Sequence, residues 1–223
     1  MSVKTIRVQA DILAGNKQAA AAIRAELRGR GILGVNLLSS PGSGKTTLLE
    51  ALADRFAGRV RMAVIEGDIE TERDAERIRR KGVPARQITT GGACHLEARM
   101  IGRALADIPA AIDILFVENV GNLVCPASYD LGEELRCVLL STPEGDDKPA
   151  KYPSAFLSAD ALVLTKIDLL PHVPFDPGRA EAEARGIKPG LRVFRVSALR
   201  GEGVDGLAAW LVEALERLRS ARA

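Results

Sequence analysis

Residues 39–47, which read SSPGSGKTT, constrain the fold of this chain more than any other part of the sequence. They follow an apolar run at 32–38 and precede a run of helical composition at 48–53. A strand, a glycine-rich turn and a helix in this order are typical of a phosphate-binding P-loop, in which backbone N–H groups and the helix dipole face the phosphates. The usual pattern has its first glycine where Ser39 stands, and an ordinary glycine–serine turn is the competing interpretation. We expect a nucleoside phosphate to bind here.

Each position of such a loop has a chemical task. Lys45 reaches the β- and γ-phosphates, so it is also a predicted catalytic residue. The Thr46 hydroxyl is a predicted ligand of Mg²⁺. The predicted phosphate-binding residues are Gly42, Ser43, Gly44, Lys45, Thr46 and Thr47.

Length and composition narrow the class of protein. The 223 residues suffice for one well-buried domain, and the 47% apolar and 27% charged residues are typical of a globular chain. A net charge of +2 argues against nucleic acid or an anionic membrane as a partner. The sequence shows neither the apolar core of a signal peptide nor a membrane-spanning run, which favours a cytoplasmic protein.

Strand-like and helix-like segments alternate along the chain after the P-loop. Strands are predicted at 60–68, 86–89, 112–118, 135–141, 161–165 and 191–196. Helices are predicted at 70–81, 95–107 and 204–221. A loop without periodicity is predicted at 142–149. This alternation indicates an α/β fold with a mainly parallel central sheet and helices on both faces, as in P-loop NTPases.

The first thirty residues precede the P-loop strand. A short strand is predicted at 6–8, and the alanine-rich composition from residue 11 to about residue 30 predicts a helix that ends near Gly29 and Gly31. We therefore divide the chain into an N-terminal helical extension, 1–30, and a P-loop domain, 31–223.

Two carboxylates stand at the ends of predicted strands. Asp68 ends the strand at 60–68, and Glu118 ends the strand at 112–118. Ligands of parallel sheets bind at the carboxyl ends of the strands, and Mg²⁺ prefers oxygen ligands. We predict that Asp68 and Glu118 hold Mg²⁺, directly or through water, and act in catalysis. The alternative is that both are solvated strand ends.

The element T-K-I-D at 165–168 resembles the N-K-x-D element that reads guanine in GTP-binding proteins. The Asp168 carboxylate accepts two hydrogen bonds from guanine N1–H and N2–H₂, a pair of donors that adenine lacks. Lys166 lays its aliphatic stem over the base, and Thr165 replaces the usual Asn. After the last strand, a backbone N–H contact to guanine O6 is predicted from Ser197, Ala198 and Leu199. GTP is the favoured nucleotide.

Thiols and an imidazole form a third group of candidates. Cys94 and His95 are adjacent, and Cys125 lies seven residues beyond Glu118. Thiolate and imidazole suit Zn²⁺ or Ni²⁺, and three ligands leave room for an exchangeable ligand or a second copy of the chain. A Cys–His nucleophile pair and a purely structural role are the alternatives. By contrast, Cys137 lies in an apolar run and is predicted in the core, and His172 on a surface loop.

Four segments together identify a resemblance: residues 39–47, GACHLEA at 92–98, the segment 118–133 and EGDDKP at 144–149. Over roughly residues 32–215 the chain resembles the HypB family of hydrogenase nickel-incorporation GTPases. The resemblance implies Mg²⁺-dependent GTP hydrolysis, GTP-linked homodimerisation, and delivery of nickel to the precursor of the [NiFe]-hydrogenase large subunit with the partner HypA. It also implies that Cys94, His95 and Cys125 are the metal ligands of the GTPase domain.

The chain departs from some members of that family. It lacks their cysteine-rich N-terminal nickel motif and their histidine-rich tract, and Arg99 stands where some members have a further histidine. Nickel storage is therefore not expected. The metal carried is Ni²⁺ or Zn²⁺, since both ions suit the ligands.

Cys125 shares a predicted loop with Glu118 and Gly121, so a γ-phosphate that orders this loop is expected to change the metal ligands. A urease-type nickel-insertion GTPase, a P-loop small-molecule kinase and a metal-binding module without nucleotide turnover are the alternative functions.

Overall fold

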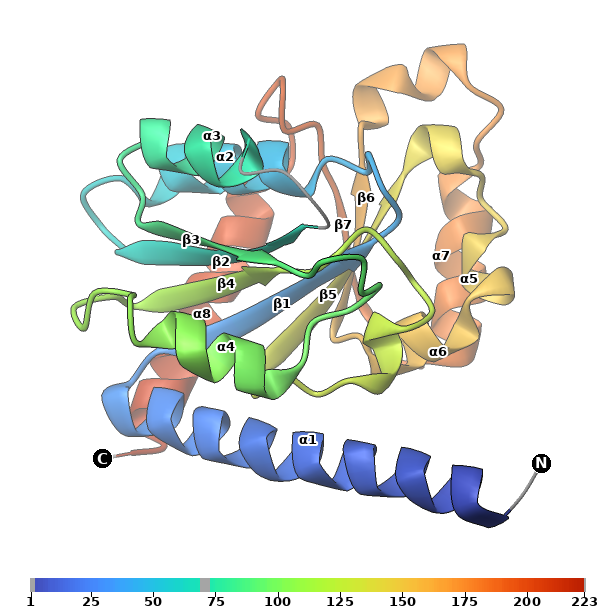
Figure 1. Ribbon diagram of the computed structural model, residues 1–223. Coiled ribbons are helices and arrows are strands. Elements are labelled where there is room, and N and C mark those ends of the chain that lie inside the picture. The colour runs from blue at the N-terminus through green and yellow to red at the C-terminus, as the bar shows by residue number, and fades with distance from the viewer. Residues whose placement is uncertain (1–2, 69–72, 223) are drawn as a thin grey trace.

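The computed structural model describes residues 3–68 and 73–222, with side chains from residue 13 onward. Seven strands form a single sheet in the order β3-β2-β4-β1-β5-β6-β7, and every neighbouring pair is parallel. The strands are β1 Leu33–Ser39, β2 Met62–Asp68, β3 Ala85–Thr89, β4 Ile114–Glu118, β5 Leu135–Ser141, β6 Ala161–Thr165 and β7 Arg192–Arg195. The predicted α/β fold is confirmed, and within the described residues the sheet is parallel throughout (Figure 1).

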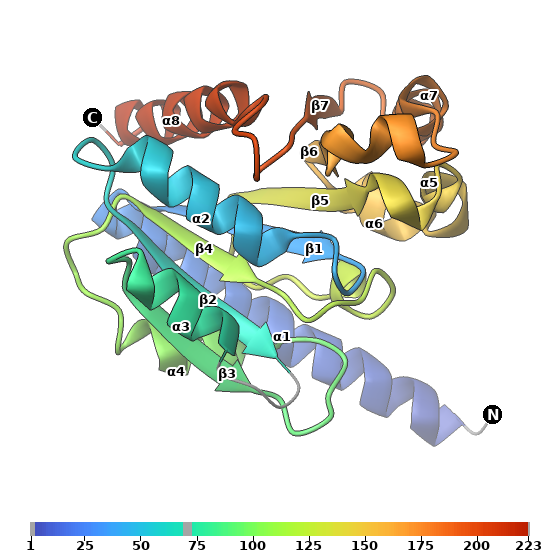
Figure 2. The ribbon, with the colours of Figure 1, turned by 90° about the horizontal axis from the view of Figure 1, so that it is seen from above.

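Helices cover both faces of this sheet (Figures 1 and 2). One face carries α2 Lys45–Phe56, α3 Arg73–Arg80 and α8 Val204–Ser220. The other face carries α1 Val3–Arg30 and α4 Ala98–Leu105 at one end, and α5 Lys148–Lys151, α6 Pro153–Ser158 and α7 Pro177–Ile187 at the other. Three short 3₁₀ turns complete the described elements: η1 Pro126–Ser128, η2 Thr142–Glu144 and η3 Ile167–His172.

The central strands are apolar runs because both of their faces are covered. Along β1, Leu37 packs beneath α2 and α8, whereas Leu38 packs on the opposite face, beneath α6 and α7. The predicted core position of Cys137 is confirmed, since it is 1% exposed within β5. Trp210 of α8 is also buried, with its ring 5.4 Å from that of Phe194 in β7.

The N-terminal helix is longer than the sequence suggested. The strand predicted at 6–8 is wrong, because these residues continue α1. A helix nucleated in the alanine-rich run adds one hydrogen bond for each further residue, which outweighs a weak local strand preference. Ile23 and Leu27 of α1 pack in one apolar cluster with Ile101 and Leu105 of α4. The boundary between residues 30 and 31 stays a prediction.

Other predicted elements differ in their ends. The loop predicted at 142–149 contains η2 and the start of α5, and η2 is held by a capping box between Ser141 and Glu144. The helix predicted at 95–107 is shorter and begins at Ala98. The helix predicted at 70–81 corresponds to α3, and residues 69–72 lie outside the described residues. Among the helices that the structure describes, none has the length and apolar character needed to cross a membrane.

Candidate nucleotide and metal sites

The predicted P-loop lies between the end of β1 and the start of α2 (Figure 2). Gly42 and Gly44 have φ angles of 71° and 93°, a left-handed conformation that glycine adopts without steric cost. Ser43 is fully buried, and its hydroxyl donates to the Ser40 carbonyl. Beside the loop, a cavity of about 450 Å³ opens at the carboxyl edge of the sheet. Its lining includes the predicted residues Gly42, Gly44, Lys45, Thr46, Thr47, Asp68, Glu118 and Lys166.

Lys45 reaches from α2 back to the end of β1. Its ammonium donates to the Ser39 hydroxyl at 2.8 Å, and both residues are buried. Burial lowers the pKa of Lys45, while the nearby Glu118 carboxylate acts in the opposite direction. Ser39, which replaces the first glycine of the usual pattern, therefore supplies an acceptor that holds the lysine at the loop.

Carboxylates line the cavity opposite the lysine. The Thr46 hydroxyl donates to Glu118 Oε1 at 2.9 Å. Glu66 in β2 and Asp74 in α3 join Glu118, with a carboxylate oxygen of each within 4.8 Å of the others. Burial raises the pKa of Glu66 to about 9 and that of Glu118 to about 7. Asp68 lines the same cavity, and its role as a Mg²⁺ ligand stays a prediction.

This arrangement fits a divalent cation. Glu66 and Glu118 are 2% and 4% exposed, and one oxygen of each carboxylate lacks a hydrogen-bond partner among the described residues. Buried, unpartnered carboxylate oxygens beside a threonine hydroxyl are a hard-ion donor set. Sequence reasoning chose Asp68 and overlooked Glu66 and Asp74. A glutamate inside an otherwise apolar strand was the available signal for Glu66.

The element at 165–168 contacts the P-loop through two hydrogen bonds. The Thr165 hydroxyl, where the usual element has Asn, donates to the Ser43 carbonyl at 2.6 Å. The Lys166 ammonium donates to the Gly42 carbonyl at 2.6 Å. The backbone of Lys166 has φ 58°, which among the described residues is the single positive φ outside glycine. The turn that aims Asp168 is therefore tied to the phosphate loop.

Asp168 is oriented by the predicted segment after β7. The Ser197 hydroxyl donates to Asp168 Oδ1 at 2.6 Å, and Ser197 is fully buried. The Ser197 N–H already donates to the Glu202 carbonyl at 3.0 Å. The Ser197 N–H is therefore already used, while its hydroxyl orients the carboxylate, and the contact of Ala198 or Leu199 to guanine O6 stays a prediction. The Leu199 side chain is 83% exposed.

The three predicted metal ligands meet at one place, although Cys125 is 31 residues from Cys94 in the sequence. A ligand atom from each of Cys94, His95 and Cys125 lies within 4.8 Å of the other two, and Cys94 Sγ lies 3.7 Å from His95 Nδ1. Cys94 is exposed, and the other two are half-buried. A hydrogen bond with Cys125 raises the pKa of the Cys94 thiol. His95 also stacks on Tyr129, with the ring centroids 3.9 Å apart.

This geometry argues against the structural alternative, because an exposed thiol is not a core residue. The N-cap position of α4 is Glu97 and not His95, so His95 does not cap this helix. His172 is exposed at the end of η3, so it lies on the surface as predicted, but in a 3₁₀ turn.

The thiol site and the P-loop share a structural connection. A Cβ on Gly121 would lie 2.9 Å from Pro41 Cα, so the loop after β4 packs directly against the P-loop backbone. Asn122 forms an antiparallel bridge with Ser39. Its side-chain amide donates to the Cys94 carbonyl at 3.2 Å. Asn122 therefore links the Cys94 carbonyl to Ser39, at the end of β1.

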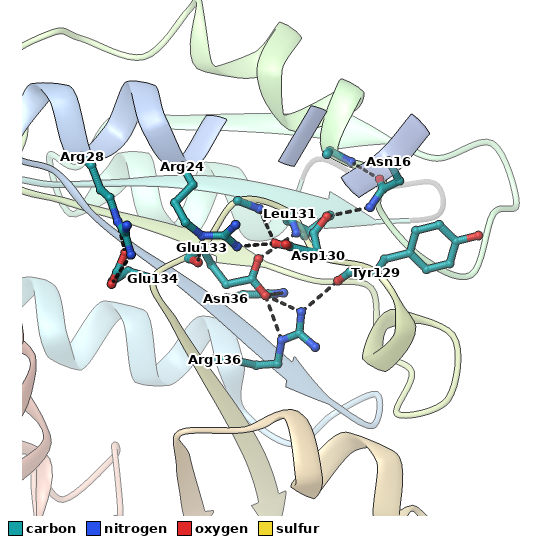
Figure 3. Close-up of polar contacts among 12 residues, drawn as sticks. Asn16, Arg24, Arg28, Asn36, Tyr129, Asp130, Leu131, Glu133, Glu134 and Arg136 are labelled. Atoms are coloured by element: carbon teal, nitrogen blue, oxygen red, sulfur yellow. Dashed lines mark hydrogen bonds and ion pairs between the residues drawn. The ribbon is translucent and has the colours of Figure 1, made fainter. Parts of the chain in front are cut away.

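A buried ion pair fixes the segment that follows Cys125 (Figure 3). The guanidinium of Arg136 pairs with Glu133, and both residues are less than 10% exposed. Arg136 also donates to the carbonyls of Ala127 and Tyr129 at 3.0 and 2.9 Å. Glu133 accepts from the Asn36 amide in β1. The position of Tyr129 beside His95 therefore depends on a network rooted in the sheet.

Comparison with known proteins finds relatives that match most of this chain. The family model described as CobW/HypB/UreG, nucleotide-binding domain, matches residues 34–195. Hydrogenase maturation factor HypB of Azotobacter vinelandii is 49% identical over 222 residues, which cover 98% of this chain and 71% of that protein. Hydrogenase/urease maturation factor HypB of Helicobacter hepaticus is 46% identical over 209 residues, covering 92% and 86%.

A solved structure agrees with these matches. The crystal structure of HypB from Helicobacter pylori in complex with nickel has a TM-score of 0.87 to this chain at 44% identity, covering 91% of this chain and 96% of that one. FlhF complexed with GTP and Mg²⁺ is 18% identical with a TM-score of 0.56, which shows a shared fold alone. By sequence and by fold, the chain belongs to the CobW/HypB/UreG family of nucleotide-binding proteins, and the relatives compared above are HypB proteins.

Proposed function

We propose that this chain is a GTP-hydrolysing nickel metallochaperone in the maturation of [NiFe]-hydrogenase. The observation that carries the proposal is the convergence of Cys94, His95 and Cys125 beside the loop after β4, which packs against the P-loop. The names of its relatives, hydrogenase maturation factors and a nickel complex, support the same function. The proposed partners are HypA and the precursor of the hydrogenase large subunit, and the proposed location, inferred from the sequence, is the cytoplasm.

The nucleotide site acts through charge and position. Lys45 and the amides of the P-loop neutralise the β- and γ-phosphates. Asp168, held by Ser197, selects guanine through two hydrogen bonds. Thr46, Glu118, Glu66, Asp74 and Asp68 are the residues that would hold Mg²⁺, which when bound neutralises charge that develops on the phosphates. Glu118 and Asp68 are the proposed carboxylates that orient the attacking water.

The thiol site suits a metal ion that is bound and then transferred to another protein. Thiolates and imidazole bind Ni²⁺ or Zn²⁺ firmly, but three ligands from one chain leave positions open. Cys94 is exposed, and the side chain of Val124, next to Cys125, is 60% exposed. An exposed ligand beside an exposed apolar side chain suits either a second copy of this chain or the protein that takes the metal. We propose that GTP favours the homodimer with metal held.

Coupling between the two sites follows from their shared backbone. A bound γ-phosphate that orders the loop after β4 moves Gly121 and Asn122, which contact Pro41 and Cys94. Hydrolysis releases that loop, as in other GTPase switches. Because linkage is reciprocal, the metal must change the nucleotide affinity by the same factor.

Nickel titration of the wild type and of Cys125→Ala, each with GDP and with a non-hydrolysable GTP analogue, tests this function. The oligomeric state is followed in the same samples. We expect the wild type to bind Ni²⁺ with a nucleotide-dependent affinity and Cys125→Ala to lose binding. Cys137→Ala is the matched control, because it removes a thiol from the core and leaves the site intact.

Three results would contradict the proposal. Equal nickel affinity in both nucleotide states would remove the coupling. Phosphate transfer to an acceptor other than water would favour a small-molecule kinase. Absence of any Lys45-dependent hydrolysis would favour a metal-binding module without nucleotide turnover. The urease-type alternative keeps support from the hydrogenase/urease factor of Helicobacter hepaticus, and reconstitution with each apoenzyme separates the two.

A further inference from the structure

Asn16 lies in the middle of α1, on the side that faces the sheet, and is 7% exposed. Its amide group bridges two segments that are distant in the sequence. Asn16 Nδ2 donates to the Asp130 carbonyl at 2.7 Å, and Asn16 Oδ1 accepts from the Ala98 N–H at 2.8 Å. Figure 3 shows Asn16 between α1 and the segment that carries Tyr129 and Asp130. Both the nitrogen and the oxygen of the amide therefore form hydrogen bonds.

The two bridged segments are the ones that carry the metal ligands. Ala98 is the first residue of α4, three residues after His95 and four after Cys94. Asp130 comes five residues after Cys125. Asn122 makes a second bridge from within the loop itself, because its side chain donates to the Cys94 carbonyl and accepts from the Val124 N–H. Asn16 makes its bridge from α1.

The bond to Ala98 replaces a missing cap. The first N–H groups of a helix have no partner within the helix, and a side chain at the N-cap usually supplies one. The N-cap residue of α4, Glu97, makes no such side-chain bond. Asn16 supplies the acceptor from another helix. The first residue of α4, which directly follows the segment 94–97, is therefore held by α1.

The bond to Asp130 holds the other side of the site. Arg24, two turns further along α1, donates to Asp130 Oδ1 at 2.6 Å and to the Glu133 carbonyl at 3.2 Å. Tyr129, directly before Asp130, stacks on His95. A shift of Asp130 away from α1 therefore moves the ring against which the imidazole ligand rests.

We infer that Asn16 is a positioning residue of the metal site, which sets the distance between the Cys94–His95 segment and the Cys125 segment. The inference rests on the proposed function, because it assumes that these residues bind nickel. Hydrogen bonds behind the ligands orient them and strengthen metal binding. The helix α1, predicted as an extension, is then a structural part of the site.

The test compares Ni²⁺ binding by the full chain with Asn16→Ala, Asn16→Asp and the wild type. Thiolate-to-metal charge-transfer absorption is recorded during each titration. Both variants lack the N–H that donates to Asp130, so we expect the nickel dissociation constant to rise about tenfold or more, with an altered charge-transfer spectrum. The GDP affinity, measured without nickel, should not change, because Asn16 does not line the nucleotide cavity. Asn16→Asp keeps an acceptor for Ala98 and carries the test if Asn16→Ala does not fold.

Arg28→Ala is the matched control on the same helix. It removes an exposed ion pair with Glu134 and touches neither ligand segment, so nickel binding should match the wild type. Wild-type affinity and spectrum in both Asn16 variants would overturn the inference, as would an equal loss in Arg28→Ala. A wild type that binds no nickel, in contrast, would overturn the proposed function itself.

Discussion

The buried guanidinium of Arg136 offers a quantitative test of how the metal-bearing segment is held. Arg136→Met keeps most of the side-chain volume and removes the charge. Four hydrogen bonds disappear, two to Glu133 and one each to the Ala127 and Tyr129 carbonyls. The Glu133 carboxylate, 9% exposed, then stays buried without its cationic partner.

The expected cost follows from that leftover charge. Breaking a buried ion pair by removing one partner costs about 3–5 kcal/mol, since the remaining charge cannot regain its hydration. Small and medium domains have a total stability of roughly 5–15 kcal/mol, so the variant loses a large share of it. For a chain of this length, the same loss corresponds to a fall in Tm of about 6–20 °C.

Urea unfolding of the apo protein at neutral pH, followed by circular dichroism, measures this cost. Arg28→Met is the control, because it breaks an exposed pair with Glu134 and should cost about 1 kcal/mol or less. Adding Glu133→Gln to Arg136→Met should recover part of the loss, since no uncompensated charge then remains. A cost below about 1 kcal/mol for Arg136→Met would refute the reasoning, because the pair would then be no better than a surface one.

Three further changes have defined outcomes. Hydrogen bonds from Arg61 hold the pKa of Asp113 well below its usual range, so Asp113→Asn should cost about 1–3 kcal/mol at neutral pH. That difference should shrink in urea titrations as the pH falls through the lowered pKa. Thr165→Val removes the donor to the Ser43 carbonyl, and calorimetry should find GDP binding weakened about fivefold, or about 1 kcal/mol. Burial raises the pKa of Glu66 from its ordinary value of 4.5 to about 9. At a pH between these two values folding takes up a proton, so the stability of the apo protein falls as the pH rises through this range. Urea unfolding across that range should find Glu66→Gln free of this decline, and an unchanged pH profile would contradict it.

The sequence predicted the fold well where burial leaves a clear pattern. Parallel strands covered on both faces must be apolar, so β5 at 135–141 and β6 at 161–165 match their predictions at both ends. The P-loop was equally readable, because its glycines and Lys45 serve a local geometry. The thiol site needed the resemblance to a family, since nothing local brings Cys125 to Cys94.

The remaining features depend on contacts between distant parts of the chain. Glu66 was passed over for Asp68, because only the pairing of β2 with β4 brings Glu66 level with Glu118. Asn16 meets Asp130 across 114 positions, and no periodicity encodes such a bond. The strand predicted at 6–8 was wrong because it relied on a local preference, whereas these residues continue the helix formed by the residues that follow them.

The burial of Trp210 has an optical consequence. The chain has one tryptophan, and it lies in α8 beside Phe194, outside the lining of the nucleotide cavity. Selective excitation therefore reports a single environment, the core between α8 and the sheet. Emission should change when that core opens and stay constant while ligands bind at the carboxyl edge. Fluorescence of this residue thus separates loss of the fold from occupancy of either site, without an added dye.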